Sequence, residues 1–347
     1  MPLTSIDQEK IKRITSALRN EHDRLRSKYK LLKFQDILGL SILLLCIVSI
    51  GFASMYWLKG QMSTVFLVLW VAFWTSILHE LEHDLIHGLY YKKSKLMVNL
   101  MTLLVWIFRP LTLNPWIRKY WHHHHHQHSG KVIDIEERGV TNGEKWSLKR
   151  LIMTPDLLFS FMFRCVRIIR EIKAEYSANR LQAKDMKMLR KTLIFGFMPI
   201  GIPAYLVFYV WVIFKLLLAF DVSILNEDTM IWWCSALDPI IYIFVLPNYI
   251  RQFCLHFITS NMHYYGDVAD GDVARQTQVL NAWWTWPFQL FCFNFGSTHS
   301  IHHFIVNEPF YTRQLSMKRA HEVFRKEGIK FNDIGSFFRG NRYSESI

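Results

Sequence analysis

Residues 79–88, HELEHDLIHG, follow directly on a long apolar run and determine how the rest of the chain is interpreted. Histidines four residues apart lie on one face of a helix, about one turn apart, so two imidazoles can bind one metal. His79 and His87 would be about 12 Å apart along such a helix, which is too far to share one ion. We therefore favour His83 and His87 as metal ligands, with His79 as the alternative ligand of this box.

Two further histidine clusters repeat one spacing, i, i+3, i+4, which brings three imidazoles to one helical face. The first consists of His122, His125 and His126, and the second of His299, His302 and His303. His263, just past the last apolar run, is one more candidate. These positions supply about nine ligands, too many for a single zinc ion but suited to two metals. Imidazole alone does not identify the metal, because iron, copper, nickel and zinc all accept it.

The remaining histidines and the nearby polar residues have weaker expected roles. We expect His123, His124 and His128 to support the ligands or lie on the surface, His256 to lie in the core, and His22 and His321 to lie on the surface. Metal-bound imidazoles usually donate their second N–H to a carboxylate or carbonyl. The candidate acceptors are Glu80, Asp84, Asp267 and Asn294, and further Glu82, Asp270 and Asp272.

Long apolar runs predict an all-α fold with four transmembrane helices at residues 34–57, 62–78, 193–220 and 229–257. Residues 96–113 are apolar but interrupted by Asn99, Arg109 and Pro110, and we interpret them as an in-plane or re-entrant segment. Residues 79–192 and 258–310 would then form a helical cap that holds a di-metal site. The membrane domain would span residues 34–310.

The two ends of the chain are polar. Residues 1–33 form a basic amphipathic segment, either a helix at the membrane surface or on the cap, or a solvated leader helix. Residues 311–347 are predicted as a polar tail. The positive-inside rule places the N-terminus, residues 115–192 and the C-terminal third in the cytosol, and the connections 58–61 and 221–228 outside. Every histidine cluster then lies on the cytosolic side of a multi-pass integral membrane protein.

Composition narrows the possible partners. The formal net charge is +13 and 51% of the residues are hydrophobic, but the basic residues lie between apolar runs rather than in a separate domain. This distribution favours the anionic membrane lipid surface, or an acidic electron carrier, over nucleic acid. The five cysteines include no CxxC pair, so we expect buried hydrophobic roles rather than disulfides or metal ligands.

The three boxes, in this order, resemble those of the membrane fatty-acid desaturase and hydroxylase superfamily. HDLIHG at 83–88 is similar to its HDxxHG box, and HHHHH at 122–126 and HSIHH at 299–303 are similar to its two HxxHH boxes. The resemblance covers roughly residues 34–310. It implies two non-haem iron ions, activation of O2, and electrons from a separate carrier of the ferredoxin, rubredoxin or cytochrome b5 type, with its reductase. Box one also resembles that of bacterial membrane fatty-acid decarboxylases that form terminal alkenes.

The resulting hypothesis is an O2-dependent membrane di-iron oxidase that desaturates or hydroxylates a fatty-acid or fatty-acyl chain. One alternative is oxidative decarboxylation of free fatty acids to terminal alkenes. A second is a zinc-dependent membrane hydrolase, because His79, Glu80 and His83 fit HExxH with Glu80 as general base; a metal transporter or scaffold is a non-enzymatic alternative. The acyl chain is expected beside Trp283, Trp284, Trp286 and Phe288, although these aromatic residues equally suit an interfacial belt.

Overall fold

The protein is described by a computed structural model that covers residues 4–222 and 225–344. Within these residues the fold is helical, with two isolated β-bridges and no longer strand, which confirms the predicted all-α class. Residues 1–3 of the predicted N-terminal helix, 223–224 of the predicted outer connection and 345–347 of the predicted tail lie outside the described residues.

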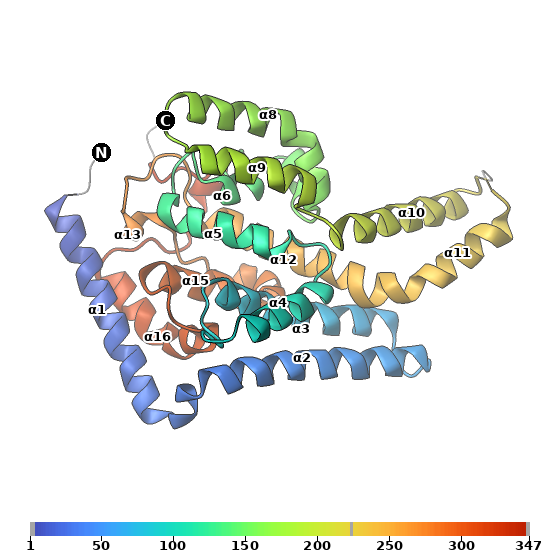
Figure 1. Cartoon of the computed structure of the whole chain (residues 1–347), viewed down its shortest axis with the longest axis horizontal. Helices are drawn as coiled ribbons and strands as arrows, with labels where there is room; N and C mark the ends of the chain where they lie inside the picture. The colour runs from blue at the N-terminus through green and yellow to red at the C-terminus, as the bar shows by residue number, and fades with distance from the viewer. Residues whose placement is uncertain (1–3, 223–224, 345–347) are drawn as a thin grey trace.

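The helices follow one another along the chain with short connections (Figure 1). In chain order they are α1 (Ser5–Lys28), η1 (Lys30–Lys33), α2 (Gln35–Leu58), α3 (Thr64–Ile86), α4 (Lys95–Ile107), α5 (Pro115–His128), α6 (Ile135–Gly139), α7 (Leu148–Met153), α8 (Leu157–Ser177), α9 (Ala183–Phe195), α10 (Gly201–Ala219), α11 (Glu227–Ile240), η2 (Ile241–Val245), α12 (Leu246–Met262), α13 (Val273–Gln276), η3 (Trp283–Thr285), α14 (Trp286–Phe291), α15 (Phe295–Phe304), α16 (Phe310–Lys326) and α17 (Gly335–Phe338).

Four helical segments among the described residues are long and apolar enough to cross a membrane: α2, α3, α10, and the continuous run Glu227–Met262 formed by α11, the π-helical turn η2 and α12. They form two hairpins that extend to the right in Figure 1, whose tips lie at the same end of the molecule. Side chains of α2 and α10 are largely exposed although they are apolar, which is stable only in lipid. The chain is therefore a membrane protein built on four candidate spans.

The observed spans differ from the predicted ones mainly in the second hairpin. The third was predicted at 193–220, but α10 begins only at Gly201. Residues 193–195 belong to the end of α9, which stops at Gly196, and Pro199 follows, so the backbone turns before the span begins. The fourth, predicted at 229–257, extends to Met262. The apolar segment predicted at 96–113 forms the short helix α4, too short to span.

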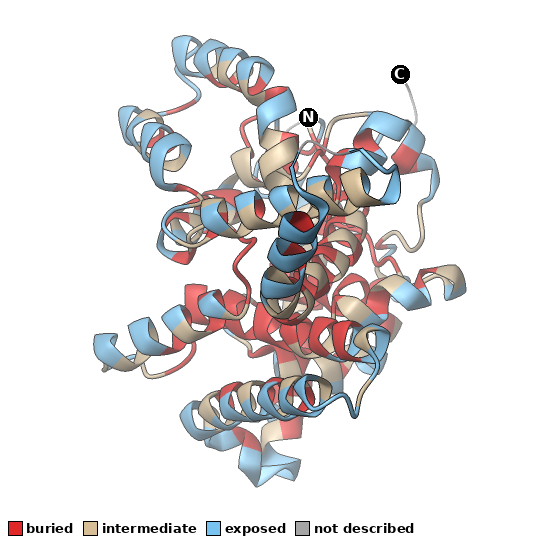
Figure 2. Ribbon diagram, turned by 90° about the vertical axis from the view of Figure 1, so that its right-hand side faces the viewer, coloured by how far each residue is buried: buried red, intermediate tan, exposed pale blue. Residues whose placement is uncertain are grey.

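A helical body lies at the other end of the hairpins, and Figure 2 shows its buried residues gathered at the centre of the molecule. α3 leaves the apolar part of its span and enters this body, where it packs against α12, α16 and α5. Residues 310–326, predicted for the most part as a polar tail, form α16 and pack against α1, α15 and α3. The cap therefore includes α1 and α16 as well as the helices between the two hairpins.

α1 packs on the cap rather than standing free in solvent. A capping box between Thr4 and Asp7 begins the helix, and Ile14 and Leu18 are fully buried against the cap. The expectation that His22 and His321 lie on the surface is wrong. His22 is buried beside Ser316 Oγ at 2.9 Å, and His321 Nε2 lies 2.7 Å from a backbone carbonyl. Both helices are amphipathic, and their charged sequences did not show which face packs.

Candidate metal centre

The polar end of α3 is buried because its acidic side chains have partners of opposite charge. Glu80 and Asp84 each lie 3.1 Å from Arg313 of α16. On another face, Glu82 pairs with Arg109 and Arg118. Buried carboxylates require such pairing, since an uncompensated charge is costly away from water. These ion pairs fix the rotation of α3 and leave the imidazole of His83 with neither nitrogen hydrogen-bonded among the described residues.

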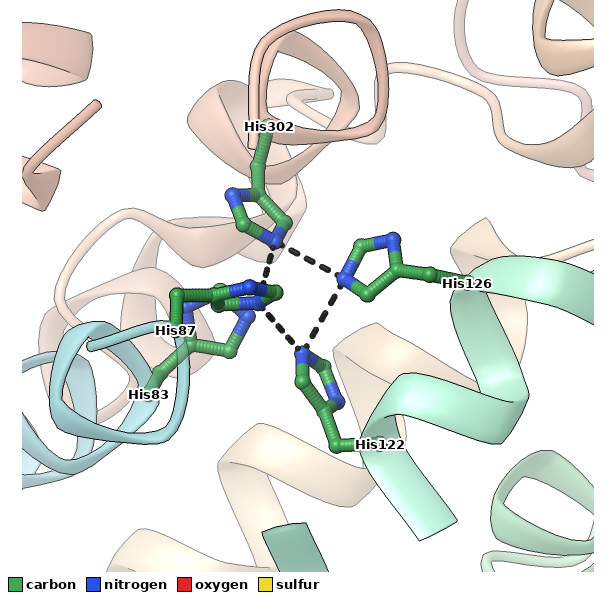
Figure 3. Close-up of side chains that lie close together, drawn as sticks. All are labelled: His83, His87, His122, His126 and His302. Atoms are coloured by element: carbon green, nitrogen blue, oxygen red, sulfur yellow. Dashed lines mark hydrogen bonds between the residues drawn. The ribbon is translucent and has the colours of Figure 1, made fainter. Parts of the chain in front are cut away.

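Five histidines from three helices form the first metal group, group one: His83, His87, His122, His126 and His302. Figure 3 shows their imidazoles pointing toward one another from α3 and its end, α5 and α15. The Nε2 atoms of His87, His122, His126 and His302 form a ring in which neighbours lie 2.9 to 3.1 Å apart.

This spacing fits one metal ion held by several imidazoles. A bond from metal to imidazole nitrogen is about 2.0–2.1 Å long, so ligands at right angles lie about 3 Å apart. His83 Nε2 is buried without a hydrogen-bond partner in the described part of the chain, as expected for a nitrogen that faces a metal. The donor set of group one therefore fits a metal with more ligands than tetrahedral zinc accepts.

Four fully buried histidines form the second group, group two: His125, His263, His299 and His303. His263 at the end of α12 approaches His303 of α15, with their Nε2 atoms 3.2 Å apart. The two groups adjoin, since His125 and His126 are neighbours in sequence and the rings of His83 and His299 are 5.4 Å apart. The nine histidines proposed as ligands thus occupy two adjacent clusters, each able to hold one metal.

Side-chain oxygens, and in one case a backbone carbonyl, contact the outer nitrogens of four ligands. Asp134 Oδ2 lies 2.7 Å from His125 Nδ1, and Glu136 Oε2 lies 2.9 Å from His122 Nδ1. The other contacts join His303 Nδ1 to Gln276 Oε1 at 2.9 Å, and His263 Nδ1 to the Thr259 carbonyl at 2.9 Å and to Glu137 Oε1 at 3.4 Å. Each contact holds a proton on Nδ1 and turns Nε2 toward the metal.

Protonation equilibria favour the metal-binding form at most of these histidines. Burial lowers the pKa of His87 to about 3 and that of His263 to about 3, so both are neutral near pH 7. His125 differs, because burial lowers its pKa but the carboxylates of Asp134 and Glu137 outweigh it and raise the pKa to about 9. A metal at group two would displace the Nε2 proton of His125 and leave Nδ1–H on Asp134.

The remaining predicted residues lie elsewhere. His79 is outside both groups, with Nδ1 3.1 Å from Arg109 Nη2. Glu80 and Asp84 contact Arg313, and Asp84 Oδ1 is 3.9 Å from His83 Nδ1, too far for a hydrogen bond. Asp267 accepts hydrogen bonds from two backbone N–H groups, and Asn294 donates to Gln314 and Met317. The acceptors that do contact ligands were not predicted, although three acids at 134–137 directly after box two offered a signal.

Histidines that belong to neither metal group differ in their surroundings. His256 lies in the core as expected, with Nδ1 3.0 Å from the Thr154 carbonyl. His124 is buried, and its ring lies 4.4 Å from that of His128. His123 is exposed, yet its ring lies 5.6 Å from that of His87. His123 therefore brings group one close to the exposed surface of α5.

A cavity of about 260 Å³ reaches both groups. Ligand residues from the two groups line one part, and apolar side chains of α8, α9 and the segment before α10 line another, including Phe161, Leu193 and Phe197. Leu193 is exposed, so the cavity reaches the molecular surface beside α9. None of Trp283, Trp284, Trp286 and Phe288 lines it, and Trp283 is 88% and Trp286 66% exposed. The expected aromatic lining is wrong, and the interfacial belt stays a prediction.

A family model described as fatty acid desaturase matches residues 60–335, which is well over half of the chain. The matched range contains all three histidine boxes, the acids at 134–137 and Gln276. No curated protein sequence matches the chain significantly.

Proposed function

The chain belongs to the fatty acid desaturase family, and from this premise we propose that it is a membrane di-iron oxidase that uses O2 to attack a C–H bond of a fatty-acid or fatty-acyl chain. The observation that carries the proposal is the pair of adjacent imidazole groups opening on an apolar cavity. Bound there, two irons would supply O2 binding and the oxidising power that C–H cleavage requires.

The residues of the chain would position the substrate and keep the ligands in place. His83 and His299 line the cavity, so a hydrocarbon chain in it passes beside both groups. Asp134 and Glu136 keep His125 and His122 in the tautomer that presents Nε2. The apolar walls exclude water and hold one carbon near the metals, which is the main contribution a protein makes to such chemistry.

The electron count of the proposed reaction requires a separate donor. Desaturation takes two electrons and two protons from the substrate, two electrons from a carrier and two protons from solvent, and O2 leaves as two waters. Hydroxylation leaves one oxygen atom on carbon and one in water, with the same two carrier electrons. We infer that a ferredoxin, rubredoxin or cytochrome b5 type protein docks on the cytosolic face near exposed His123, which lies beside His87.

The zinc hydrolase alternative loses its geometric support. That mechanism needs His79 and His83 on one metal and Glu80 free to activate water. Instead, His79 lies in neither metal group and its Nδ1 contacts Arg109, while the carboxylate of Glu80 contacts Arg313. Oxidative decarboxylation uses the same groups and remains a separate outcome, in which a free fatty acid loses CO2 and two hydrogens to give a terminal alkene.

The deciding experiment is anaerobic reconstitution with Fe(II), followed by metal counting and then O2, a reducing system, and lauric or palmitic acid, free or as the CoA ester. We expect about two irons per chain, as the two groups imply, and O2-dependent products in gas chromatography. An internal alkene, an alcohol and a terminal alkene identify desaturation, hydroxylation and decarboxylation. One zinc per chain with no O2 uptake would contradict the proposal.

A further inference from the structure

The cavity follows one face of α12 from the membrane toward group two. Arg251, Leu255, Thr259 and His263 line it, and they are four residues apart, so they form a stripe along the helix. Twelve residues of helix separate the ends of this stripe by about 18 Å. The end at His263 belongs to group two, and the other end carries a guanidinium group.

Arg251 differs from the other arginines of the cavity because no carboxylate lies within ion-pair distance of it among residues 4–222 and 225–344. Arg109 pairs with Glu82, and Arg118 lies 3.3 Å from Glu82 and 3.4 Å from Glu136. At the opposite wall, Arg164 donates to the carbonyls of Arg138 and Gly139 at 3.0 and 2.7 Å and lies 3.5 Å from Glu144.

The guanidinium of Arg251 is almost wholly removed from solvent, with 1% of the residue exposed. Its Nε donates to Asn248 Oδ1 at 3.1 Å, but Nη1 and Nη2 have no hydrogen-bond partner among the residues that the structure describes. A buried, unpaired guanidinium is unfavourable, since it keeps its charge under all ordinary conditions. Its two free nitrogens suit a bidentate carboxylate.

The surrounding charges also favour an anion. Among the arginines that line the cavity, Arg109 and Arg118 pair with Glu82 and Glu136, so these two carboxylates are engaged and the charge of Arg251 has no ion-pair partner among the described residues. Beyond it the walls are hydrocarbon, as at Leu158, Ile168 and Leu189. A single anionic head and a long apolar tail together match such a site.

We propose that Arg251 binds the carboxylate of a free fatty acid inside the cavity, with the hydrocarbon chain held between α8, α9 and α12. The inference rests on the proposed function for its substrate class. A CoA or carrier-protein thioester has no free carboxylate, so the unesterified acid is the species bound. The carbon presented to the metal groups is then set by its distance from the carboxyl end, whatever the length of the tail.

Equilibrium binding to the full-length, metal-free protein in detergent tests this, with radiolabelled palmitic acid, methyl palmitate and phosphatidic acid as probes. We expect Arg251→Met to weaken palmitic acid binding by at least about tenfold and to leave methyl palmitate binding unchanged. Arg251→Lys keeps the charge but loses the bidentate geometry, so its affinity for palmitic acid should fall to a value between those of the native protein and Arg251→Met. Arg167→Met is the matched control, because it removes the same charge from an exposed position on α8.

Several outcomes would overturn the assignment: unchanged palmitic acid binding in Arg251→Met, an equal loss in Arg167→Met, or Arg251-dependent binding of phosphatidic acid alone, which would assign the site to a lipid phosphate. Thermal unfolding checks that each variant is folded. If Arg251→Met does not fold, the binding measured for Arg251→Lys still tests the proposal. If palmitic acid binds through Arg251 but the iron-loaded protein consumes no O2, the proposed function fails and this inference stands. If the iron-loaded protein oxidises palmitic acid but Arg251→Met binds it as tightly as the native protein, the inference about Arg251 fails and the proposed function stands.

Discussion

The grouped histidines differ in whether the nitrogen that faces away from the metal position has a hydrogen-bond partner. His122, His125 and His303 each have a side-chain oxygen within 2.9 Å of Nδ1. His83 has no hydrogen bond at either nitrogen among the described residues, and its position rests on the ion pairs around α3. A histidine whose Nδ1 contacts an oxygen is held in the metal-binding orientation before the metal binds. Substituting the residue that provides this oxygen should therefore change the metal affinity measurably.

Removing one imidazole should empty group one alone. We expect His302→Ala to lose about one metal per chain and all turnover, because His302 Nε2 lies 3.0 Å from those of both His87 and His126. Metal analysis and circular dichroism measure the loss and the retained helices. His79→Gln is the control, since His79 lies outside both groups and should leave metal content unchanged. Full metal content in His302→Ala would contradict the ligand assignment.

Asp134→Asn should weaken metal binding at group two without removing a ligand. The amide cannot accept the Nδ1 proton of His125 as strongly as the carboxylate 2.7 Å away, so we expect metal affinity to fall by about 10- to 100-fold. Competition with a chelator measures the affinity. Asp267→Asn provides the comparison, since Asp267 accepts hydrogen bonds from backbone N–H groups near the C-terminus, and equal losses in both variants would refute the role of Asp134.

At the scale of single residues, the spacing of ligands was predictable and their support was not. The pattern i, i+3, i+4 follows from helix geometry alone, so the sequence suffices to group His122, His125 and His126. The contact between His303 and Gln276 spans 27 residues and depends on how α13 meets α15. Arg251 is visible in the sequence only as a charge within an apolar run, and its lack of an acidic partner among the described residues depends on tertiary packing.

The helix α3 joins the membrane to the metal centre, and α16 keeps it in place. Arg313 of α16 contacts Glu80 and Asp84 at 3.1 Å, and all three side chains are fully buried. Because α3 contributes His83 to group one, the ion pairs of its other faces set the direction of that imidazole.

Removing the ion pairs between α16 and α3 should destabilise the cap strongly. We expect Arg313→Met to cost about 3–5 kcal/mol, since it leaves two carboxylates buried without a cation. Thermal unfolding in detergent measures the effect. Arg319→Met on the same helix should cost at most about 1 kcal/mol, because its pair with Glu322 is exposed. Adding Glu80→Gln and Asp84→Asn to Arg313→Met should restore part of the loss, and the absence of any restoration would count against the ion-pair explanation.

Packing of α1 on the cap can be tested in the same way. Leu18 is fully buried between α1 and the cap, so Leu18→Ala should cost about 2–5 kcal/mol. Ile6→Ala changes an exposed side chain of the same helix and should have little effect on thermal unfolding. Equal, small effects from both would favour a helix that acts at the membrane surface instead.

The bounds of a helix could be predicted from the sequence where the length of an uninterrupted apolar run determines them. α2 was expected at 34–57 and is found at Gln35–Leu58, because no charged residue interrupts its apolar run after Asp36. α10 begins eight residues later than expected, since Gly196 and Pro199 end the helical pattern within an apolar stretch. The packing of α16 into the cap could not be predicted, because its partner charges on α3 are more than two hundred residues away.

On the scale of the whole molecule, the buried histidines make the metal-free fold sensitive to acid. His87 and His263 have a pKa of about 3 in the folded protein and about 6.5 when unfolded. Between pH 6.5 and 3 the unfolded chain therefore binds protons that the folded chain does not, and the free energy of unfolding falls as pH is lowered. His125, with its pKa of about 9, contributes stability below pH 6.5 that is lost as pH rises toward 9.

We expect the free energy of unfolding of the metal-free protein in detergent to fall between pH 6.5 and pH 5, by up to about 1.4 kcal/mol for each such histidine and pH unit. Bound metal should hold the same histidines neutral and shift the loss to lower pH. Melting curves of both forms across this range measure the difference. A metal-free protein that grows more stable toward pH 5 would contradict the assignment of these histidines as buried and neutral.

The overall architecture was largely predictable because lipid imposes simple rules. Four apolar runs and three polar boxes led to one set of spans with every box at the same end, and the hairpin tips do lie together at the opposite end. The cavity was not predictable, since its walls come from α8, α9, α12 and the segment before α10, whose mutual packing no local pattern determines.

The order in which the ligands occur along the chain has a consequence for biosynthesis. Group one receives His83, His87, His122 and His126 from the first half of the protein and then lacks only His302. Group two has only His125 until His263, His299 and His303 are translated. A nascent chain with its first hairpin inserted has therefore already received four of the five histidines of group one but only one of the four histidines of group two. Group one therefore collects most of its ligands earlier in synthesis than group two, although both groups are completed within α15, at His302 and His303.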